Sequence, residues 1–216
     1  MKLFGKKLRA PWRSYGQTVF RGDWPFRLEG LFESGVEFGG KRILDAGCNV
    51  GIVAYEVAKQ GPASIHGVDY FPDFIETAGH IFHGYRKLPH KFDVLDLTKA
   101  RQVEQTLAAD YDVVIFMAVW QHIYERHGPA IAEHVAGDLA KRCKETLVAR
   151  TSPASIAEKF TAIMQREGLH VAHEWRGARM KAGDGERVLT VYSRLQPPLS
   201  KDAATTERTP SFTVTA

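Results

Sequence analysis

Apolar residues in the middle of the chain follow two alternating patterns. Short apolar runs bounded by turn residues alternate with longer segments in which apolar residues return every three or four positions. A short run of this kind is typical of a buried strand, and the wider spacing is typical of an amphipathic helix. The alternation predicts a doubly wound α/β fold, with a mostly parallel sheet and helices on both of its faces.

Seven strands are expected, with helices between most of them. The predicted strands lie at residues 42–46, 64–69, 91–97, 112–119, 145–150, 169–175 and 187–194. The predicted helices lie at residues 24–32, 52–61, 72–82, 100–107, 129–142 and 152–168. Only a glycine-containing loop separates the last two strands, and so short a link permits an antiparallel hairpin rather than a right-handed crossover. The last strand is therefore expected to be antiparallel.

Length and charge divide the chain into three parts. The 216 residues, with a net charge of +4, suit one globular domain with a sizeable core. Much of the positive charge lies in residues 1–22, which also carry large aromatic side chains and show no clear periodicity. We expect a basic and aromatic N-terminal segment at 1–22, one domain at 23–195, and a disordered tail rich in Pro, Ser and Thr at 196–216.

The cysteines and histidines indicate neither a disulfide framework nor a metal site. Cys48 and Cys143 lie far apart in the sequence, which favours a reducing, cytoplasmic setting. His80 and His83 are close together on a predicted helix, but no third ligand accompanies them. No apolar run approaches the roughly 20 residues that span a bilayer, so no membrane span is expected.

A glycine-containing loop follows the first predicted strand. The sequence Leu-Asp-Ala-Gly-Cys-Asn-Val-Gly at residues 44–51 leads into a helical pattern of apolar residues. Glycine allows positive φ angles and lets a ligand approach the main chain closely. The next helix offers unpaired N–H groups and the positive end of its dipole. The loop fits neither the dinucleotide fingerprint G-x-G-x-x-G nor a P-loop, because no Gly-Lys-Ser/Thr follows.

This loop closely resembles motif I of the class I S-adenosylmethionine-dependent methyltransferases. A glycine turn in another nucleotide-binding α/β protein is the alternative, since such turns follow strands in many folds. The predicted order of elements over residues 24–195 is also similar to the order in this family, whose strands run 3-2-1-4-5-7-6. The resemblance implies that S-adenosylmethionine is the cofactor. In an open parallel sheet it would bind beyond the carboxyl ends of strands one to four.

The resemblance assigns cofactor contacts to the ends of the first two strands. The loop residues expected to face the aminocarboxypropyl group are Gly47, Cys48, Asn49 and Gly51. Asp45 would order the loop and reach the cofactor's amino group, or cap the following helix. Asp69 ends the second strand, where the pattern matches motif II, and Tyr70 follows it in the cofactor site. A carboxylate there can accept hydrogen bonds from both ribose hydroxyls, and an ordinary helix cap is the alternative.

The third and fourth strands add further cofactor candidates. Two acids compete at the third strand, Asp93 and Asp96, and the family often places an acid there to accept from the adenine N6 amine. The pair Asp96-Leu97 lies nearer the predicted end of the strand, which favours Asp96. At the end of the fourth strand, Met117 and Ala118 would line the sulfonium end of the cofactor.

His122 follows the fourth strand and is the candidate general base. The family often closes this strand with a histidine shortly after an apolar stop, as here. Methyl transfer is an in-line displacement that depends on alignment and desolvation, and a base is needed only if the nucleophile still carries its proton. Because a histidine titrates near neutral pH, His122 suits this role; otherwise it lines the site without proton transfer. The nearby Trp120 either covers the adenine or fills the core.

The acceptor is expected to be a small molecule that is methylated on oxygen or nitrogen. Neither Asp/Asn-Pro-Pro-Tyr/Phe nor Pro-Cys follows the fourth strand, and in the family these motifs accompany methylation of nucleic-acid bases. The substrate residues would be Arg21, Trp24 and Tyr124, from the N-terminal segment and the loops. Two alternatives stay open: an RNA methyltransferase whose basic arm tracks phosphates, and a module that binds S-adenosylmethionine without catalysis.

Overall fold

The computed structural model describes most of the chain. The described residues are 2–3, 6–7, 13–14, 17–18, 28–151, 154–177 and 187–195. Arg21, Trp24 and the predicted tail at 196–216 lie outside them, so the roles given to these residues stay predictions. Near the N-terminus the described residues form two short antiparallel hairpins. Their strands are β1 (Lys2–Leu3), β2 (Lys6–Lys7), β3 (Arg13–Ser14) and β4 (Gln17–Thr18).

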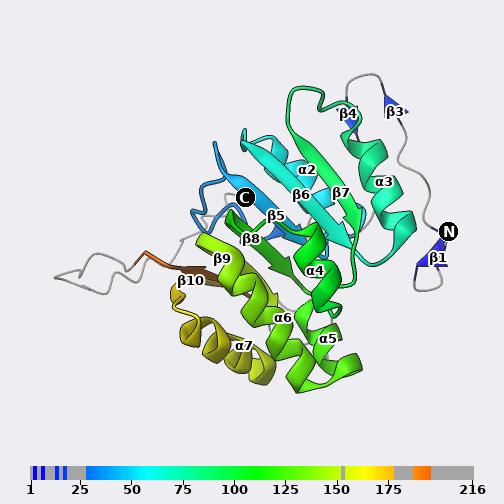
Figure 1. The fold of residues 1–216 in the computed structure, drawn as a ribbon. Helices are drawn as coiled ribbons and strands as arrows, with labels where there is room; N and C mark the ends of the chain where they lie inside the picture. The colour runs from blue at the N-terminus through cyan, green and yellow to red at the C-terminus, as the bar shows by residue number, and fades with distance from the viewer. Residues whose placement is uncertain are drawn as a thin grey trace, which may run out of the picture.

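A seven-stranded sheet forms the centre of the fold (Figure 1). Its strands are β5 (Arg42–Ala46), β6 (Ser64–Asp69), β7 (His90–Val94), β8 (Tyr111–Met117), β9 (Cys143–Thr151), β10 (His170–Gly177) and β11 (Arg187–Ser193). They lie in the order β10-β11-β9-β8-β5-β6-β7. β11 is antiparallel to both of its neighbours, and the other pairs are parallel. Counted from β5, this is the order 3-2-1-4-5-7-6, so the predicted fold class is confirmed.

Helices cover both faces of this sheet. Those of the described chain are α2 (Ile52–Ala58), α3 (Pro72–Phe82), α4 (Ala100–Thr106), α5 (Trp120–His127), α6 (Pro129–Arg142) and α7 (Ala154–Arg166). α2 and α3 pack on one face with residues 28–38, and α4 to α7 pack on the other. Leu28 is helical and residues 29–35 form turns, so the helix predicted at 24–32 ends earlier than predicted. Because the chain changes faces between β7 and β8, the strand order reverses between β5 and β8.

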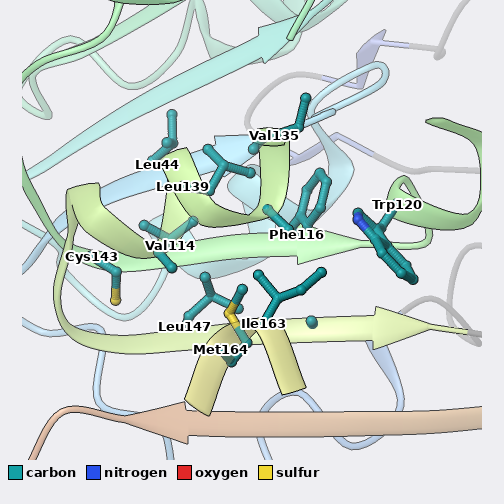
Figure 2. Close-up of a cluster of buried hydrophobic side chains, with 14 of the residues drawn as sticks. Leu44, Val114, Phe116, Trp120, Val135, Leu139, Cys143, Leu147, Ile163 and Met164 are labelled. Carbon is teal, nitrogen blue, oxygen red and sulfur yellow. The ribbon is translucent and has the colours of Figure 1, made fainter. Parts of the chain in front are cut away.

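Alternate residues of the central strands fill two separate cores. In β8, Val114 and Phe116 belong to the cluster under α6 and α7 (Figure 2), whereas Val113 and Ile115 belong to the cluster under α2. Leu44 of β5 joins the first cluster. A strand covered on both faces appears in the sequence as a near-continuous apolar run, which is why the sequence predicts β8 directly.

Two boundaries differ from those predicted, and both matter for the site. β7 ends at Val94, before the predicted end of this strand. β8 ends at Met117 and helix α5 begins at Trp120, although the strand was predicted to run to residue 119 with no helix after it. Ala118 has a φ of +58°, which ends the extended backbone. The apolar positions of α5 merge with the run that precedes them, and this hides their helical period.

Three further findings concern the described residues as a set. None of their helices has both the length and the apolar character needed to cross a membrane. No group of three or more His, Cys, Asp or Glu side chains among them is arranged to hold a metal ion. Cys48 and Cys143 are both buried and free.

Arg194 joins the end of the sheet to two helices. Its Nε donates to the carbonyl of Cys143 at 2.6 Å, Nη1 to that of Glu167 at 2.8 Å, and Nη2 to that of Ala140 at 2.5 Å. Ala140 lies in the last turn of α6, where its carbonyl also accepts from the Cys143 N–H, and Glu167 follows the end of α7. One guanidinium therefore satisfies three backbone carbonyls.

Replacing this guanidinium tests how much the join stabilises the fold. Arg194→Met keeps an apolar stem but removes a donor from each of the three carbonyls, and we expect the free energy of unfolding to fall by about 2 to 4 kcal/mol. Arg166→Met is the matched control and should have a much smaller effect, because Arg166 forms an exposed ion pair with Glu133. Urea unfolding followed by circular dichroism measures both variants. Equal losses would contradict a special role for Arg194.

Candidate active site

The carboxyl ends of β5, β6, β7 and β8 meet at one edge of the sheet (Figure 1). In open parallel sheets, ligands bind beyond this edge, at the point where the strand order reverses. Here that point lies between β5 and β8. The predicted cofactor residues stand at these four strand ends or on the segments that directly follow them.

The loop after β5 is built from left-handed backbone. Gly47, Asn49 and Gly51 have φ angles of +80°, +52° and +79°. A Cβ on Gly47 would lie 2.4 Å from Cγ2 of Val119, so only glycine lets the loop pack this closely against the segment after β8. The Gly47 N–H also donates to the carbonyl of Val68 in β6 at 2.8 Å. The loop is thus held between the ends of β6 and β8.

Cys48 forms the floor of this loop. Its side chain is buried, and a Cβ on Gly67 would lie 3.1 Å from its Sγ. Burial raises the pKa of the Cys48 thiol, with smaller contributions from the negative Asp45 and Asp69, so the thiol stays protonated. A ligand above the loop would therefore meet the backbone of Cys48 rather than its sulfur.

Asp69 ties the end of β6 to the glycine loop. Its Oδ2 accepts from the Asn49 N–H at 2.9 Å, and its Oδ1 accepts from the Phe71 N–H at 3.1 Å. The residue is 8% exposed, and burial raises the pKa of its carboxyl although backbone N–H groups act to lower it. Helix α3 has Phe71 at its N-cap and no side-chain cap. Asp69 is therefore not an ordinary helix cap.

Asp45 is the most buried acid of the site. It is 3% exposed, and its Oδ2 has no hydrogen-bond partner among the described residues. Burial and the nearby negative Asp69 raise the pKa of Asp45 to about 7, although the Ala54 N–H acts to lower it. That contact with the first turn of α2 supports the predicted role of Asp45 in ordering the loop. The second oxygen can still accept a hydrogen bond from a ligand.

The two acids of the third strand have different surroundings. Asp93 Oδ2 lies 2.8 Å from Nε2 of the buried His66 and 3.0 Å from Nζ of Lys91, and His66 Nδ1 lies 2.6 Å from the Tyr111 hydroxyl. This network belongs to the body of the sheet. Asp96 lies past the end of β7 and accepts through Oδ1 from both the N–H and the hydroxyl of Thr98, at 2.9 and 2.7 Å. Asp96 is thus the acid at the strand's carboxyl end, and Leu97 beside it is half-buried.

The end of β8 turns sharply toward helix α5. Met117 pairs with Arg150 of β9, and the Ala118 N–H donates to the Arg150 carbonyl at 2.9 Å. Trp120 is 1% exposed, and its Nε1 donates to the carbonyl of Ala132 at 2.8 Å. Trp120 therefore fills the core, as Figure 2 shows, and does not cover the adenine.

One face of α5 is turned toward the loop after β6. The Arg126 Nη1 donates to the Tyr70 hydroxyl at 3.2 Å, and the Tyr70 ring stacks on that of Phe71 with centroids 3.8 Å apart. His122 lies one turn before Arg126 on the same side of the helix. Its side chain is 60% exposed, and Nδ1 lies 3.9 Å from Oε2 of Glu125. The candidate base therefore stands at the open rim of the site, on a helix rather than on a strand end.

Tyr124 faces a different direction from His122. Its hydroxyl accepts from the Lys159 Nζ of α7 at 2.8 Å, and the Lys159 ammonium also lies 5.1 Å from the centre of its ring. The Trp120 ring is 5.3 Å from the Tyr124 ring. The predicted substrate residue thus lies between α5 and α7, away from the glycine loop.

Two buried polar side chains near the site are missing from the predicted set. Gln121 is the second residue of α5, and Arg150 stands near the end of β9 with Nη2 donating to the carbonyl of Glu29. Gln121 belongs to a helix that the sequence does not predict. Arg150 is one of several arginines near predicted loops, and most arginines lie in solvent. Its position at the end of a predicted strand, beside Met117, is the signal that could have distinguished it.

Known proteins match the part of the chain that contains this site. The sequence model of a family described as a methyltransferase domain matches residues 44–146. A ubiquinone biosynthesis O-methyltransferase of Neisseria meningitidis serogroup C (strain 053442) is 27% identical over 118 residues, which cover 54% of the chain and 46% of that relative. The chain therefore matches about half the length of the curated relatives that resemble it.

Solved structures share the fold. The magnesium protoporphyrin IX methyltransferase of Synechocystis PCC 6803, solved with bound SAM, has a TM-score of 0.58 at 21% identity, over 76% of the chain and 74% of that protein. The N-methyltransferase NodS of Bradyrhizobium japonicum WM9 has a TM-score of 0.62 at 16% identity, over 79% of the chain and 97% of that protein. At these identities the likeness shows the fold alone. Together with the matching domain, it supports the family predicted from the glycine loop, the class I methyltransferases that use S-adenosylmethionine.

Proposed function

We propose that this protein transfers the methyl group of S-adenosylmethionine to an oxygen or nitrogen atom of a small-molecule acceptor. The observation that carries the proposal is the pair of buried carboxylates, Asp45 and Asp69, on either side of a close-packed glycine loop. Asp45 Oδ2 is buried without a partner in the described chain, and an unpaired carboxylate oxygen is costly. The cationic amino group of the cofactor fits that atom in both charge and hydrogen bonding.

The remaining cofactor contacts follow the strand ends in order. The loop backbone at Gly47, Cys48, Asn49 and Gly51 would hold the aminocarboxypropyl group, because the glycines let a ligand approach closely. Asp69 would accept from the ribose hydroxyls, beside Tyr70. Asp96 and Leu97 would hold the adenine. Met117 and Ala118 would line the sulfonium end.

The protein's own task is to align the acceptor and to take its proton. The cofactor supplies a methyl group on a positively charged sulfur, which is a good leaving group. His122 would accept the proton that the acceptor oxygen or nitrogen loses. It stands on the face of α5 that contacts Tyr70 through Arg126, and Glu125 is near enough to orient its ring. Proton transfer at the rim of the site leaves the buried carboxylates free to bind the cofactor.

A small-molecule acceptor has the better support. The curated relatives are named for ubiquinone biosynthesis, and they match about half of the chain. The RNA alternative depends on the basic N-terminal arm, of which the structure describes only four short strands. We also propose a reducing, cytoplasmic setting, which the two free and buried cysteines support.

Asp45→Asn should remove a pH dependence from the stability of the cofactor-free protein. The pKa of Asp45 is about 7 in the fold and about 3.9 in an unfolded chain. Because the folded pKa is the higher one, the free energy of unfolding falls as pH rises from about 4 to about 7. At pH 8 the variant should be more stable than the wild type by about 2 to 4 kcal/mol, and at pH 4 the two should be similar.

Urea unfolding at pH 4, 6 and 8 measures this difference. With S-adenosylhomocysteine present at pH 8, the wild type should become the more stable of the two proteins, because the ligand's amino group pairs with the carboxylate of Asp45 and not with an amide. Parallel pH profiles for the two proteins would contradict the raised pKa. An equal gain from the ligand in both would contradict the role of Asp45.

Asp69→Asn should weaken the binding of S-adenosylhomocysteine by about tenfold or more, because a neutral amide is a poorer acceptor for ribose hydroxyls than a carboxylate. Isothermal titration calorimetry gives the affinity, and circular dichroism shows whether the variant is folded. Asp73→Asn is the matched control, since Asp73 is exposed on α3. An unchanged affinity in Asp69→Asn would mean that the ribose assignment is wrong.

The same calorimetry with the wild type tests the proposed function as a whole. No heat and no thermal shift at millimolar ligand would remove the cofactor claim. Methyl-labelled S-adenosylmethionine, incubated with the protein and a cell extract, then identifies the acceptor class. Label in the low-mass fraction after nuclease treatment supports a small molecule, whereas label that nuclease releases from large RNA supports the RNA alternative. Binding without any labelled product indicates a non-catalytic module.

His122→Ala should reduce methyl transfer in this assay by about 100-fold, as expected for the loss of a general base. Its affinity for S-adenosylhomocysteine should change by no more than about twofold, because His122 lies at the rim and not among the cofactor contacts. His127→Ala is the control, since His127 is also exposed on α5. If cofactor binding and methyl transfer fall together, His122 is a binding residue and not a base.

A further inference from the structure

Gln121 is buried although it points away from the core between the sheet and helices α6 and α7. Its side chain is 8% exposed, and its Oε1 has no hydrogen-bond donor among the described residues. Successive residues of a helix are turned by about 100°, so Gln121 points nearly opposite to Ile123, which packs in the core under α6. The amide is therefore enclosed near the carboxyl edge of the sheet.

The neighbours of Gln121 place it beside the candidate active site. Val119 contacts the glycine loop at Gly47, and Ala118 is bonded to the carbonyl of Arg150. Around α5, Gln121 lies between the face that contacts Tyr70 and the face that contacts Lys159. Gln121 follows the segment of Ala118 and Val119, on a helix that begins where β8 ends between β5 and β9.

A buried carbonyl oxygen without a donor makes the fold less stable. A single unmet hydrogen bond of this kind costs about 1 to 3 kcal/mol, and most buried polar side chains in proteins have a partner. An apolar residue of similar volume, such as methionine, would avoid the cost. A ligand that brings its own donor accounts for a glutamine at this position.

We infer that Gln121 Oε1 accepts a hydrogen bond from the acceptor and selects compounds that carry a hydroxyl or an amino N–H at that point. The inference rests on the proposed function and specifies its substrate class. The cofactor's ammonium group is better matched by the carboxylate of Asp45, because charge-assisted bonds are the stronger ones. The neutral amide of Gln121 is left for a neutral donor. A site built in this way rejects analogues that lack the donor, since binding them leaves the amide unpaired.

Gln121→Met tests the inference through three measurements. The melting temperature of the ligand-free protein should rise by about 2 to 4 °C, because the unpaired oxygen is removed. The affinity for S-adenosylhomocysteine should stay within about twofold. Transfer of labelled methyl from S-adenosylmethionine to the nuclease-treated, low-mass extract should fall by about tenfold or more. Gln165→Met makes the same change at an exposed position of α7 and should leave all three measurements unchanged.

Each opposite result would overturn the inference. A lower or unchanged melting temperature in Gln121→Met would mean that Oε1 has a partner in the fold, such as a buried water. A tenfold loss of S-adenosylhomocysteine affinity would place Gln121 in the cofactor site. Undiminished methyl transfer would show that the acceptor does not use the amide. If the proposed function is wrong, the wild type itself neither binds S-adenosylhomocysteine nor labels the extract. The inference about Gln121 then fails as well, and the wild-type result distinguishes this case from a failure of the inference alone.

Discussion

The geometry of the whole site depends on the hydrogen bond from the Asn49 N–H to Asp69 Oδ2. It joins the loop after β5 to the end of β6. The hydrogen bond from the Gly47 N–H to the Val68 carbonyl joins the same two segments one residue earlier in β6. The contact of Gly47 with Val119 adds the end of β8. Because three neighbouring strand ends hold the loop, its left-handed backbone is in place before a ligand arrives. Such preorganisation lowers the entropy cost of binding.

This arrangement makes the ligand-free protein less stable. Asp45 and Asp69 are two acids in a buried space, and both have a raised pKa. Asp93 shows the opposite case, because Lys91 and His66 outweigh its burial and lower its pKa. The acid within the sheet has its own cationic partners, whereas the acids at the glycine loop are satisfied only in part by backbone N–H groups. Residual strain of this kind is concentrated at functional sites, where the ligand relieves it.

The sequence predicts the sheet and the residues at its carboxyl edge because both depend on local signals. β8 is recognisable from its apolar run, and the glycine loop from residues that its positive φ angles require. Helix α5 has no such signal, because Ala118 ends the strand through a backbone angle that no residue type announces. The burial of Trp120 and Gln121 follows from that helix and is equally hidden. What the sequence could not reveal was therefore the side of the site where tertiary packing decides which residues are buried.

The cofactor side and the acceptor side of the site are built from different parts of the fold. The cofactor residues stand at the ends of adjacent parallel strands, whose spacing is fixed by their hydrogen bonds. The acceptor side that we propose consists of α5 and the turns at residues 29–35, where the Glu29 carbonyl meets Arg150 and the Trp175 ring packs against Gly30. Substitutions on α5 can therefore change the acceptor without moving the glycine loop. Such a separation lets one fold serve methyltransferases with unrelated acceptors, and under the role we propose for Gln121 the buried amide on α5 is a stronger guide to the acceptor than the glycine-loop motif.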